Sequence, residues 1–353
     1  MESITRGRKQ ENLARAFPRQ APVDEQLAFL LGYAVLAPSG HNTQPWLFDI
    51  HDDAIWLYAD TSKDVPALDP KGREQMMSCG AALFHLRVSA RHAGITPVVE
   101  RFPDGYDEDR PAPVARFQLG TPEPPSVAEE QLFSAIRRRR THREEFSSLP
   151  VPAADREALA SAAREEGAAL TFVEGLNARR QLHDMVLQAN DTMMSDPAVR
   201  RELAAWTSRP GDEEGVLGAT RGWSRWQTAA SAFLLQFPLV RLRPWKQEAG
   251  EVRTAPVLAI LSTPGDTEKD WLSAGEALAR VLLLATSYGL GASFLNQPVK
   301  VPSVRRNVAA LLPDDGYPQI ILRMGGVSTS QPRTGRREPQ VDIPEEGSTS
   351  GPS

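Results

Sequence analysis

The sequence predicts an α+β protein in which one strand–helix–strand unit occurs twice along the chain. Two segments align at a constant offset of 195 residues, and the identical pairs are Ser78/Ser273, Gly80/Gly275, Ala82/Ala277, Leu83/Leu278, Ala90/Ala285 and Gly94/Gly289. A segment of strand type lies before and after each aligned segment. An ordered recurrence of this kind is typical of a duplicated fold. The alternative is that helices rich in Ala, Leu and Gly resemble one another by composition alone.

Each aligned segment is expected to form one long buried helix that ends at a glycine, Gly94 in the first copy and Gly289 in the second. The flanking strands are expected at residues 55–58, 114–120, 257–261 and 319–325. Apolar residues at helical spacing also predict a helix over residues 27–36. Pro38 ends that helix because it disfavours helical geometry at the preceding residue.

Length and composition describe a globular protein with one large core or two of ordinary size. The chain has 353 residues, of which 41% are hydrophobic and 24% charged. A net charge of -5 gives no electrostatic case for binding nucleic acid or an anionic membrane. No apolar run approaches the roughly 20 residues that span a bilayer, and residues 1–19 lack an apolar signal core. We therefore expect a cytoplasmic protein without membrane or nucleic-acid partners.

The single cysteine, Cys79, excludes an intrachain disulfide and argues against a cysteine-based metal site. The six histidines are scattered along the chain, and His85 and His92 do not stand at a recognisable ligand spacing. We expect no bound metal.

The loop from Ala37 to Trp46 has residue types that suit a site for a flat polar ring. Small residues allow the backbone to approach a ligand closely, and two amide side chains offer paired donors and acceptors that match an imide edge. The residues expected at this site are Pro38, Ser39, Gly40, Asn42 and Gln44. The loop therefore indicates a flavin. A plain turn is the alternative, since Pro, Ser and Asn cluster in turns.

A basic run at residues 137–143, Arg-Arg-Arg-Arg-Thr-His-Arg, opens the second copy. A phosphate monoester is best bound by charged bidentate donors together with a hydroxyl group. The candidate phosphate-binding residues in the run are Arg139, Arg140, Thr141 and Arg143. The alternative is a solvated basic patch, or a salt-bridged helix face opposite Glu144 and Glu145.

Both motifs resemble those of the nitroreductase family. The loop is similar to the family's Ala-Pro-Ser-x-x-Asn-x-Gln-Pro-Trp loop, and the basic run to its Arg-x-Ser-x-Arg/Lys signature, with Thr141 in place of the commoner serine. Over about residues 27–326 the chain most resembles the Acg-like branch, in which one polypeptide mimics the usual homodimer. Further features of this resemblance are Asp69-x-x-x-Arg73-Glu74, Ser78-Cys-Gly-Ala-Ala82, Phe146 at the end of the basic run, and Pro318-Gln319 before Arg323-x-Gly325.

The resemblance implies a nitroreductase-like fold of two tandem repeats, each a mainly antiparallel sheet flanked by helices, packed as an intramolecular pseudo-dimer. The expected boundaries are an N-terminal arm at 1–20, a first half at 21–125, a second half at 126–330 and a disordered tail at 331–353. Residues 200–250 hold four of the seven tryptophans, Trp206, Trp223, Trp226 and Trp245. This insertion is expected to be either a lid over the cofactor or a peripheral packing layer.

In the family the basic run holds the FMN phosphate and ribityl chain from one subunit, while the Pro-Ser loop comes from the other. Here one chain supplies both parts, which implies a single composite FMN site. At the place of the loop, the second copy is expected to offer residues 188–192 instead. The resemblance adds Arg323, where the first copy has Gln118, as a phosphate contact. It also implies that the backbone of Gly291, Ala292 and Ser293 approaches flavin N5, although a helix cap followed by a turn is the alternative.

Two functions are compatible with these motifs. The first is an FMN-dependent oxidoreductase that transfers hydride from NAD(P)H through FMN to a small planar acceptor, nitroaromatic or quinone-like. The sequence has no dinucleotide-binding fingerprint, so NAD(P)H would bind transiently over the flavin, before the acceptor. The second is a flavin-binding or flavin-sequestering protein with a lidded site and little turnover. Both need the same cofactor contacts, and the motifs identify no catalytic residue.

Overall fold

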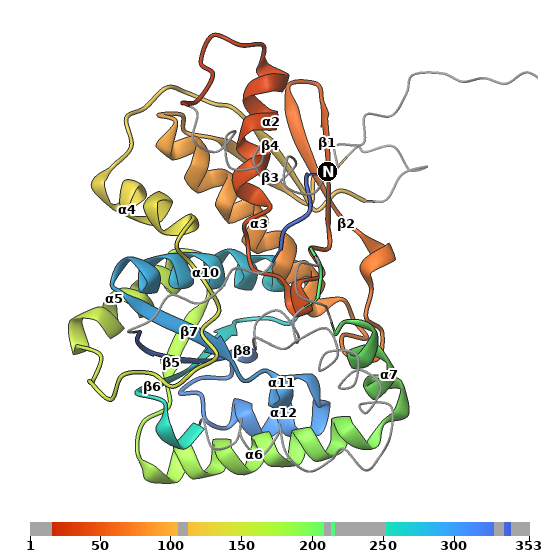
Figure 1. Cartoon of the computed structure of the whole chain (residues 1–353), viewed down its shortest axis with the longest axis vertical. Coiled ribbons are helices and arrows are strands. Elements are labelled where there is room, and N and C mark those ends of the chain that lie inside the picture. Colours follow the sequence, from red (N-terminus) through yellow and green to blue (C-terminus); the bar gives the residue numbers. More distant parts are fainter. Residues whose placement is uncertain (1–15, 105–111, 208–212, 216–251, 328–334, 340–353) are drawn as a thin grey trace, which may run out of the picture.

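The computed structural model describes residues 16–104, 112–207, 213–215, 252–327 and 335–339 (Figure 1). The elements of the first half are α2 (Val23–Ala34), η1 (Gly40–Asn42), β1 (Trp46–His51), β2 (Ala54–Ala59), η2 (Thr61–Lys63), α3 (Arg73–His92), β3 (Val98–Arg101) and β4 (Ala115–Gln118). Those of the second half are α4 (Val127–Ile136), α5 (Ala153–Arg164), β5 (Ala169–Phe172), α6 (Leu176–Ser195), α7 (Pro197–Ala205), β6 (Val257–Thr263), α10 (Glu268–Ser287), β7 (Leu290–Phe294), α11 (Gln297–Lys300), α12 (Pro302–Ala309) and β8 (Tyr317–Gly326).

The described strands form two four-stranded antiparallel sheets with the same topology. The orders are β1-β2-β4-β3 and β5-β6-β8-β7. Helices flank both sheets, and in Figure 1 the first sheet lies in the upper part of the molecule and the second in the lower part. The expected α+β fold of two similar antiparallel halves is confirmed.

The two long helices, α3 and α10, cross at the centre of the molecule (Figure 1). A Cβ atom on Gly80 would lie 2.1 Å from the carbonyl oxygen of Leu272, and one on Gly275 would lie 2.0 Å from that of Met77. Met77 and Leu272 are separated by the same 195 residues as the two glycines, so the contact is reciprocal. Two halves related by a pseudo-two-fold axis through this crossing are expected to make such a contact.

Strand register repeats the same relation. Val98 lies opposite Gln118 in the first sheet, as Ser293 lies opposite Arg323 in the second. The offset of 195 residues therefore extends from the helices to β3 and β7, whereas β4 and β8 are related by an offset of 205 residues. Both helices also end as expected at glycines with positive φ, Gly94 and Gly289 (75° each).

One expected equivalence is wrong. Helix α2 followed by β1 corresponds to α5 followed by β5, so the long polar loop of the first half corresponds to the short turn 165–168 in the second. Residues 188–192 lie beyond β5, within α6. The segment 289–298, expected as a loop after the helix or as a helix cap followed by a turn, contains β7 and the start of α11. Its residues are mostly apolar and small, which suits an edge strand packed against a helix.

Separate hydrophobic clusters fill the halves and are joined through the two central helices. The first-half cluster includes Phe48, Phe84 and Phe117, together with Leu272 and Leu283 of α10. The second-half cluster lies between α10, α5 and the second sheet. The sheets and the crossing therefore fix the positions of the loops that meet between the halves.

Residues 200–207 and 213–215 of the insertion lie within the described residues. Helix α7 and Trp206 pack with Val65 and Leu68 of the first half, and the Glu202 carboxylate accepts the backbone N–H of Leu68 at 2.7 Å. Helix α7 and Trp206 therefore form a packing layer, whereas the carbonyl oxygen of Glu213 accepts hydrogen bonds from the side chains of Asn42 and Gln44 in the first half. Trp223, Trp226 and Trp245 lie outside the described residues, so the lid stays a prediction.

Among the described residues, no helix combines the length and hydropathy needed to cross a membrane. The described residues also include no group of three or more His, Cys, Asp or Glu side chains that could hold a metal ion.

Candidate functional site

The polar loop after α2 holds an unusual backbone conformation. His41, Asn42 and Gln44 have φ values of 49°, 55° and 51°, in the left-handed region that non-glycine residues seldom adopt. Hydrogen bonds stabilise this conformation: the Gln44 N–H donates to Ser39 Oγ at 3.0 Å, and the Gly40 N–H donates to Ser78 Oγ at 3.3 Å. The second bond attaches the loop to α3. Backbone strain of this kind is often found at functional sites.

The arginines of the basic run differ in their surroundings. Helix α4 ends at Ile136, and the run continues as irregular chain. Arg137 and Arg138 are exposed, but Arg139 is only 7% exposed. Arg140 turns back, because its Nη1 donates to the carbonyl oxygens of Arg137 (2.9 Å) and Arg139 (2.7 Å). The run is therefore neither a helix face nor a uniformly solvated patch.

The basic run follows the edge of the second sheet. Thr141 forms a parallel bridge with Ala292 on β7, and the His142 N–H donates to the Ala292 carbonyl at 2.8 Å. The buried Arg323 side chain, opposite Ser293, donates to the Glu144 carbonyl at 3.3 Å. The predicted site residues from the run, β7 and β8 are thus brought together at one edge.

The edge of the second sheet meets the loop of the first half. Arg139 Nη2 lies 3.5 Å from the carbonyl oxygen of Leu36, where the loop begins. The charge of Arg143 is close enough to His41 to lower the pKa of that imidazole. The structure therefore combines the two predicted parts of the site within a single chain.

The small size of Gly291 has a packing explanation. A Cβ atom there would lie 2.4 Å from Val327 Cγ1 and 3.0 Å from His142 Cβ. The glycine is needed whether or not a ligand approaches, so its presence is no evidence for the N5 contact.

The amide side chains of Asn42 and Gln44 bind other parts of the chain. Both amide nitrogens donate to the carbonyl oxygen of Glu213, at 3.0 Å and 2.7 Å. Arg336 Nη1 donates to Asn42 Oδ1 at 2.6 Å, and the Arg337 N–H donates to Gln44 Oε1 at 2.9 Å. We call residues 335–339 the C-terminal strap. Part of the tail that was expected to be disordered therefore lies on the loop.

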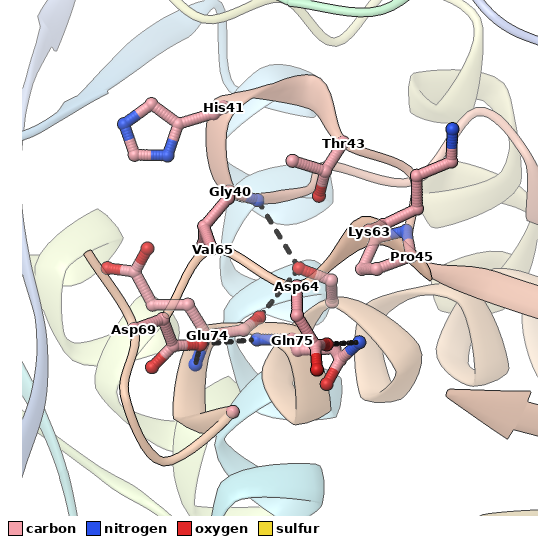
Figure 2. A pocket seen from close by; sticks show the side chains of 12 residues that line it. Gly40, His41, Thr43, Pro45, Lys63, Asp64, Val65, Asp69, Glu74 and Gln75 are labelled. Atoms are coloured by element: carbon pink, nitrogen blue, oxygen red, sulfur yellow. Dashed lines mark hydrogen bonds between the residues drawn. The ribbon is translucent and has the colours of Figure 1, made fainter. Parts of the chain in front are cut away.

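A small cavity of about 20 Å³ lies beneath the loop (Figure 2). Gly40, His41 and Thr43 line it from the loop, and Glu74 and Gln75 line it from α3. Figure 2 shows the loop passing over the first turn of α3. The Asp69 carboxylate caps that turn by accepting the N–H groups of Glu74 (2.7 Å) and Gln75 (3.0 Å).

A buried ion pair joins the halves at this cavity. Lys300 Nζ, on α11, lies 2.7 Å from Glu74 Oε2, and each side chain is 9% exposed. Burial raises the pKa of Glu74, but the charges of Lys300 and Arg73 outweigh it and hold the pKa below its ordinary value. Burial, together with the charge of Lys300, lowers the pKa of His41 to about 4. At neutral pH the carboxylate is ionised and the imidazole is neutral.

His85 of α3 is a second buried neutral imidazole. Its Nδ1 lies 3.1 Å from the Tyr33 carbonyl oxygen, which can only accept, so Nδ1 carries the proton and Nε2 is an acceptor. Among the described residues Nε2 has no hydrogen-bond partner. Burial first, then the nearby charge of Arg139, lower the pKa of His85 to about 3. His85 is thus a neutral acceptor within reach of the charge of Arg139.

The sequence motifs do not assign five residues to the site: Glu74, His85, Lys300, Arg336 and Arg337. Glu74 and Lys300 are 226 residues apart, and neither stands at a spacing that indicates its partner. Arg336 and Arg337 lie in a segment rich in Pro, Ser and Gly, which the composition alone describes as tail.

Comparisons with known proteins identify the class of this fold and site. The Nitroreductase family model matches residues 136–325. The Mycobacterium tuberculosis protein named "Putative NAD(P)H nitroreductase Rv3131" is 34% identical over 331 residues, covering 92% of this chain and 93% of that protein. "Putative NAD(P)H nitroreductase acg", from the same organism, is 30% identical over 295 residues, covering 83% and 86%. The chain belongs to the nitroreductase family.

Solved structures show a more distant likeness. The FMN-dependent nitroreductase NfnB of Mycobacterium smegmatis, in complex with NADPH, has 18% identity and a TM-score of 0.36, covering 64% of this chain and 98% of that protein. A Desulfitobacterium hafniense nitroreductase with bound FMN has 14% identity and a TM-score of 0.34, covering 57% and 92%. Membership of the family does not depend on these structures.

Proposed function

We propose that this chain is an FMN-binding oxidoreductase in which one composite site forms where the two halves meet. The proposal rests on one observation above all: Arg139 Nη2 of the second half lies 3.5 Å from the carbonyl oxygen of Leu36 in the first, and the charge of Arg143 lowers the pKa of His41. In a family whose motifs are shared between two subunits, this meeting would let one chain hold one cofactor as a monomer.

The donor set fits the phosphate of FMN. Arg139, Thr141, Arg143 and Arg323 would bind the phosphate and the adjoining chain, with charged hydrogen bonds of about 1.5–3 kcal/mol each. His85 Nε2, a buried acceptor, would accept a hydrogen bond from an N–H or O–H group of the cofactor. The backbone of residues 291–293 is proposed to lie against the ring. When bound, FMN supplies a ring that accepts and returns hydride.

The proposed reaction takes hydride from NAD(P)H and passes it to a small planar acceptor, nitroaromatic or quinone-like. The names of the sequence relatives support this donor. Both described sheets are antiparallel, whereas nicotinamide dinucleotides are most often held by a parallel sheet with a glycine-rich turn. NAD(P)H would therefore bind transiently where the acceptor binds later. His41 and His85, both neutral at pH 7, would not repel a cationic nicotinamide ring.

A flavin-sequestering protein is the second candidate, and the C-terminal strap favours it. Glu213 and the strap already use the hydrogen-bonding groups of Asn42 and Gln44. Segments held this way over a bound flavin would restrict access to the ring without removing its phosphate contacts. The buried Cys79, the single cysteine of the chain, is compatible with the proposed cytoplasmic location.

The visible spectrum of the purified protein tests both candidates. We expect flavin absorbance after purification or after adding FMN, and bleaching of that absorbance when NADPH is added without oxygen. Bound flavin that does not bleach would favour sequestration. Absence of flavin binding under both conditions would refute the proposal.

A further inference from the structure

A second, larger cleft lies on the other side of the α3–α10 crossing. It has a volume of about 490 Å³ and is bounded by α3, β3, α4 and one residue of α10. Four arginines line it, Arg87, Arg91, Arg101 and Arg280, and we call it the arginine cleft. Its apolar lining includes Val88, Val99 and Leu132. None of the sequence motifs pointed to this cleft.

The arginine cleft is the pseudo-symmetric counterpart of the candidate flavin site. Thr96 and Pro97, which line it, correspond at the offset of 195 to Gly291 and Ala292. Arg280 corresponds to His85, the buried acceptor of the candidate site. The same helix face and the same edge strand therefore contribute to both places.

The loop that covers the candidate site has a different counterpart at the arginine cleft. The turn 165–168 takes the place of the first-half loop. Its Glu166 binds Arg87 at 2.6 Å and Arg280 at 2.8 Å, and its Glu165 binds Arg280 at 2.7 Å. Two carboxylates thus stand where the first half has the Pro-Ser loop.

Side chains that face the two clefts have diverged in charge. Arg87, Arg91 and Arg101 correspond at the same offset to the neutral Leu282, Thr286 and Asn296. In the opposite direction, Gln118 lies opposite Val98 in the first sheet, at the place where Arg323 lies opposite Ser293 in the second. The arginine cleft therefore has its own set of cations and lacks a basic residue that the candidate flavin site uses.

The guanidinium groups of the cleft are held rigidly but retain free donors. Glu276, only 1% exposed, binds Arg87 at 2.8 Å and Arg101 at 2.8 Å and 2.9 Å. Arg87 makes its ion pairs through Nη1 alone, and Arg280 makes its pairs through Nε and Nη1. Among the described residues, Arg87 Nη2, Arg101 Nη1 and Arg280 Nη2 have no hydrogen-bond partner. Donors fixed in this way lose little freedom when they bind a ligand.

We propose that the arginine cleft binds a small organic anion, a carboxylate or phosphate ester with an apolar body. The free N–H groups match anionic oxygens, and the aliphatic lining matches an apolar body. Glu165, Glu166 and Glu276 balance three of the arginines. Glu123 and Glu129, which also line the cleft, bind Arg91 at 3.1 Å and 2.6 Å, so the site selects by hydrogen-bond geometry and not by net charge. Flavin binds elsewhere in the proposed function, and this inference does not depend on it.

Calorimetric titration of the full-length protein with phenyl phosphate tests the proposal. Val99→Trp would fill the cleft without removing an ion pair, and Arg101→Gln would remove a partly exposed cation while leaving Glu276 bound to Arg87. We expect each substitution to lower the affinity for phenyl phosphate at least tenfold. Arg138→Gln, at an exposed arginine outside the cleft, should leave the affinity for phenyl phosphate unchanged. Inorganic phosphate should bind at least tenfold more weakly than phenyl phosphate.

Thermal unfolding of each variant is measured alongside, so that a loss of fold is not mistaken for a loss of binding. No binding to the parent protein would overturn the proposal, and so would unchanged affinity in folded Val99→Trp. Equal affinity for inorganic phosphate would overturn the assignment of an apolar body. None of these results depends on bound flavin.

Discussion

Arg137 and Arg139 are two positions apart in the same basic run, yet one is exposed and the other is almost completely buried. The run of identical residue types gave no way to rank them, and only the family signature separated them. The end of α4 at Ile136 makes the difference, because the chain then turns Arg139 inward beneath the loop of the first half.

This difference predicts the effect of alanine substitutions on FMN affinity. Arg139→Ala and Arg143→Ala should each lower the affinity for FMN about tenfold or more, since a lost charged hydrogen bond costs about 1.5–3 kcal/mol of binding free energy. Arg137→Ala should have little effect. Quenching of FMN fluorescence during titration with each variant measures the affinities. Equal losses in all three variants would instead support a diffuse basic patch.

His85 predicts a dependence of stability on pH. Its pKa is lowered from 6.5 to about 3 in the folded protein, so the unfolded chain binds the proton more tightly. The contribution of His85 to the free energy of unfolding is therefore fully present above pH 6.5 and is lost as the pH drops from 6.5 toward 3. At pH 5 the loss from this residue alone is about 2 kcal/mol.

Urea unfolding at pH 7 and pH 5 tests this prediction. His85→Gln should lose less stability than the parent protein between the two pH values, because the amide does not titrate. His183→Gln, on the partly exposed side of α6, should show the parent's difference. An equal difference in parent and His85→Gln would show that the imidazole does not titrate on unfolding.

At the scale of elements, the α3–α10 crossing depends on two glycines. The Cβ positions of Gly80 and Gly275 point at backbone carbonyl groups of the opposing helix, which have no side-chain freedom to move away. The sequence offset correctly paired these residues. The offset did not explain why both residues are glycine, because a sequence repeat does not show which helices contact each other.

Gly80→Ala and Gly275→Ala should each destabilise the protein by about 3 kcal/mol, because the helices must separate to accept a methyl group. Gly167→Ala is a matched control: its φ is 77°, but no atom lies within 4 Å of the new Cβ. That change should cost only about 1 kcal/mol of backbone strain. Unfolding in urea measures all three. A loss at Gly80 no greater than at Gly167 would contradict close packing at the crossing.

The C-terminal strap predicts that the tail affects ligand binding. A chain that ends at Thr334 lacks Arg336 and Arg337, which frees both amide oxygens of the loop. We expect this chain to bind FMN more tightly and to be reduced faster by NADPH in stopped-flow absorbance. A chain that ends at Pro339 keeps the strap and should behave like the parent. Parent behaviour in both truncated chains would show that the strap does not compete with the ligand.

At the scale of the whole molecule, the two halves share a fold but present different clefts at their junction. The sequence predicted the repeated fold because helix periodicity and glycine caps are local signals. It predicted the loop and the basic run because their motifs are local as well. The Glu74–Lys300 pair, the strap and the arginine cleft were not predicted, since each joins residues that only the folded chain brings together.

Asymmetry at this scale predicts one FMN for each monomeric chain. In the described part of the chain, the polar loop of the first half meets the basic run at Arg139, whereas Glu165 and Glu166 take the place of that loop beside the arginine cleft. Titration of the apo-protein should saturate at one equivalent, and light scattering should give the mass of one chain. Two equivalent sites on each chain would contradict the prediction.

The reciprocal packing of Gly80 and Gly275 has a consequence for how this molecule can change. In a homodimer every mutation is expressed twice, so a substitution that improves one cleft is imposed on the other. A single chain removes that constraint: position 85 can stay histidine while position 280 is arginine, and each can be selected separately. The crossing itself has no such freedom, because a change at either glycine alters the one surface that both copies share.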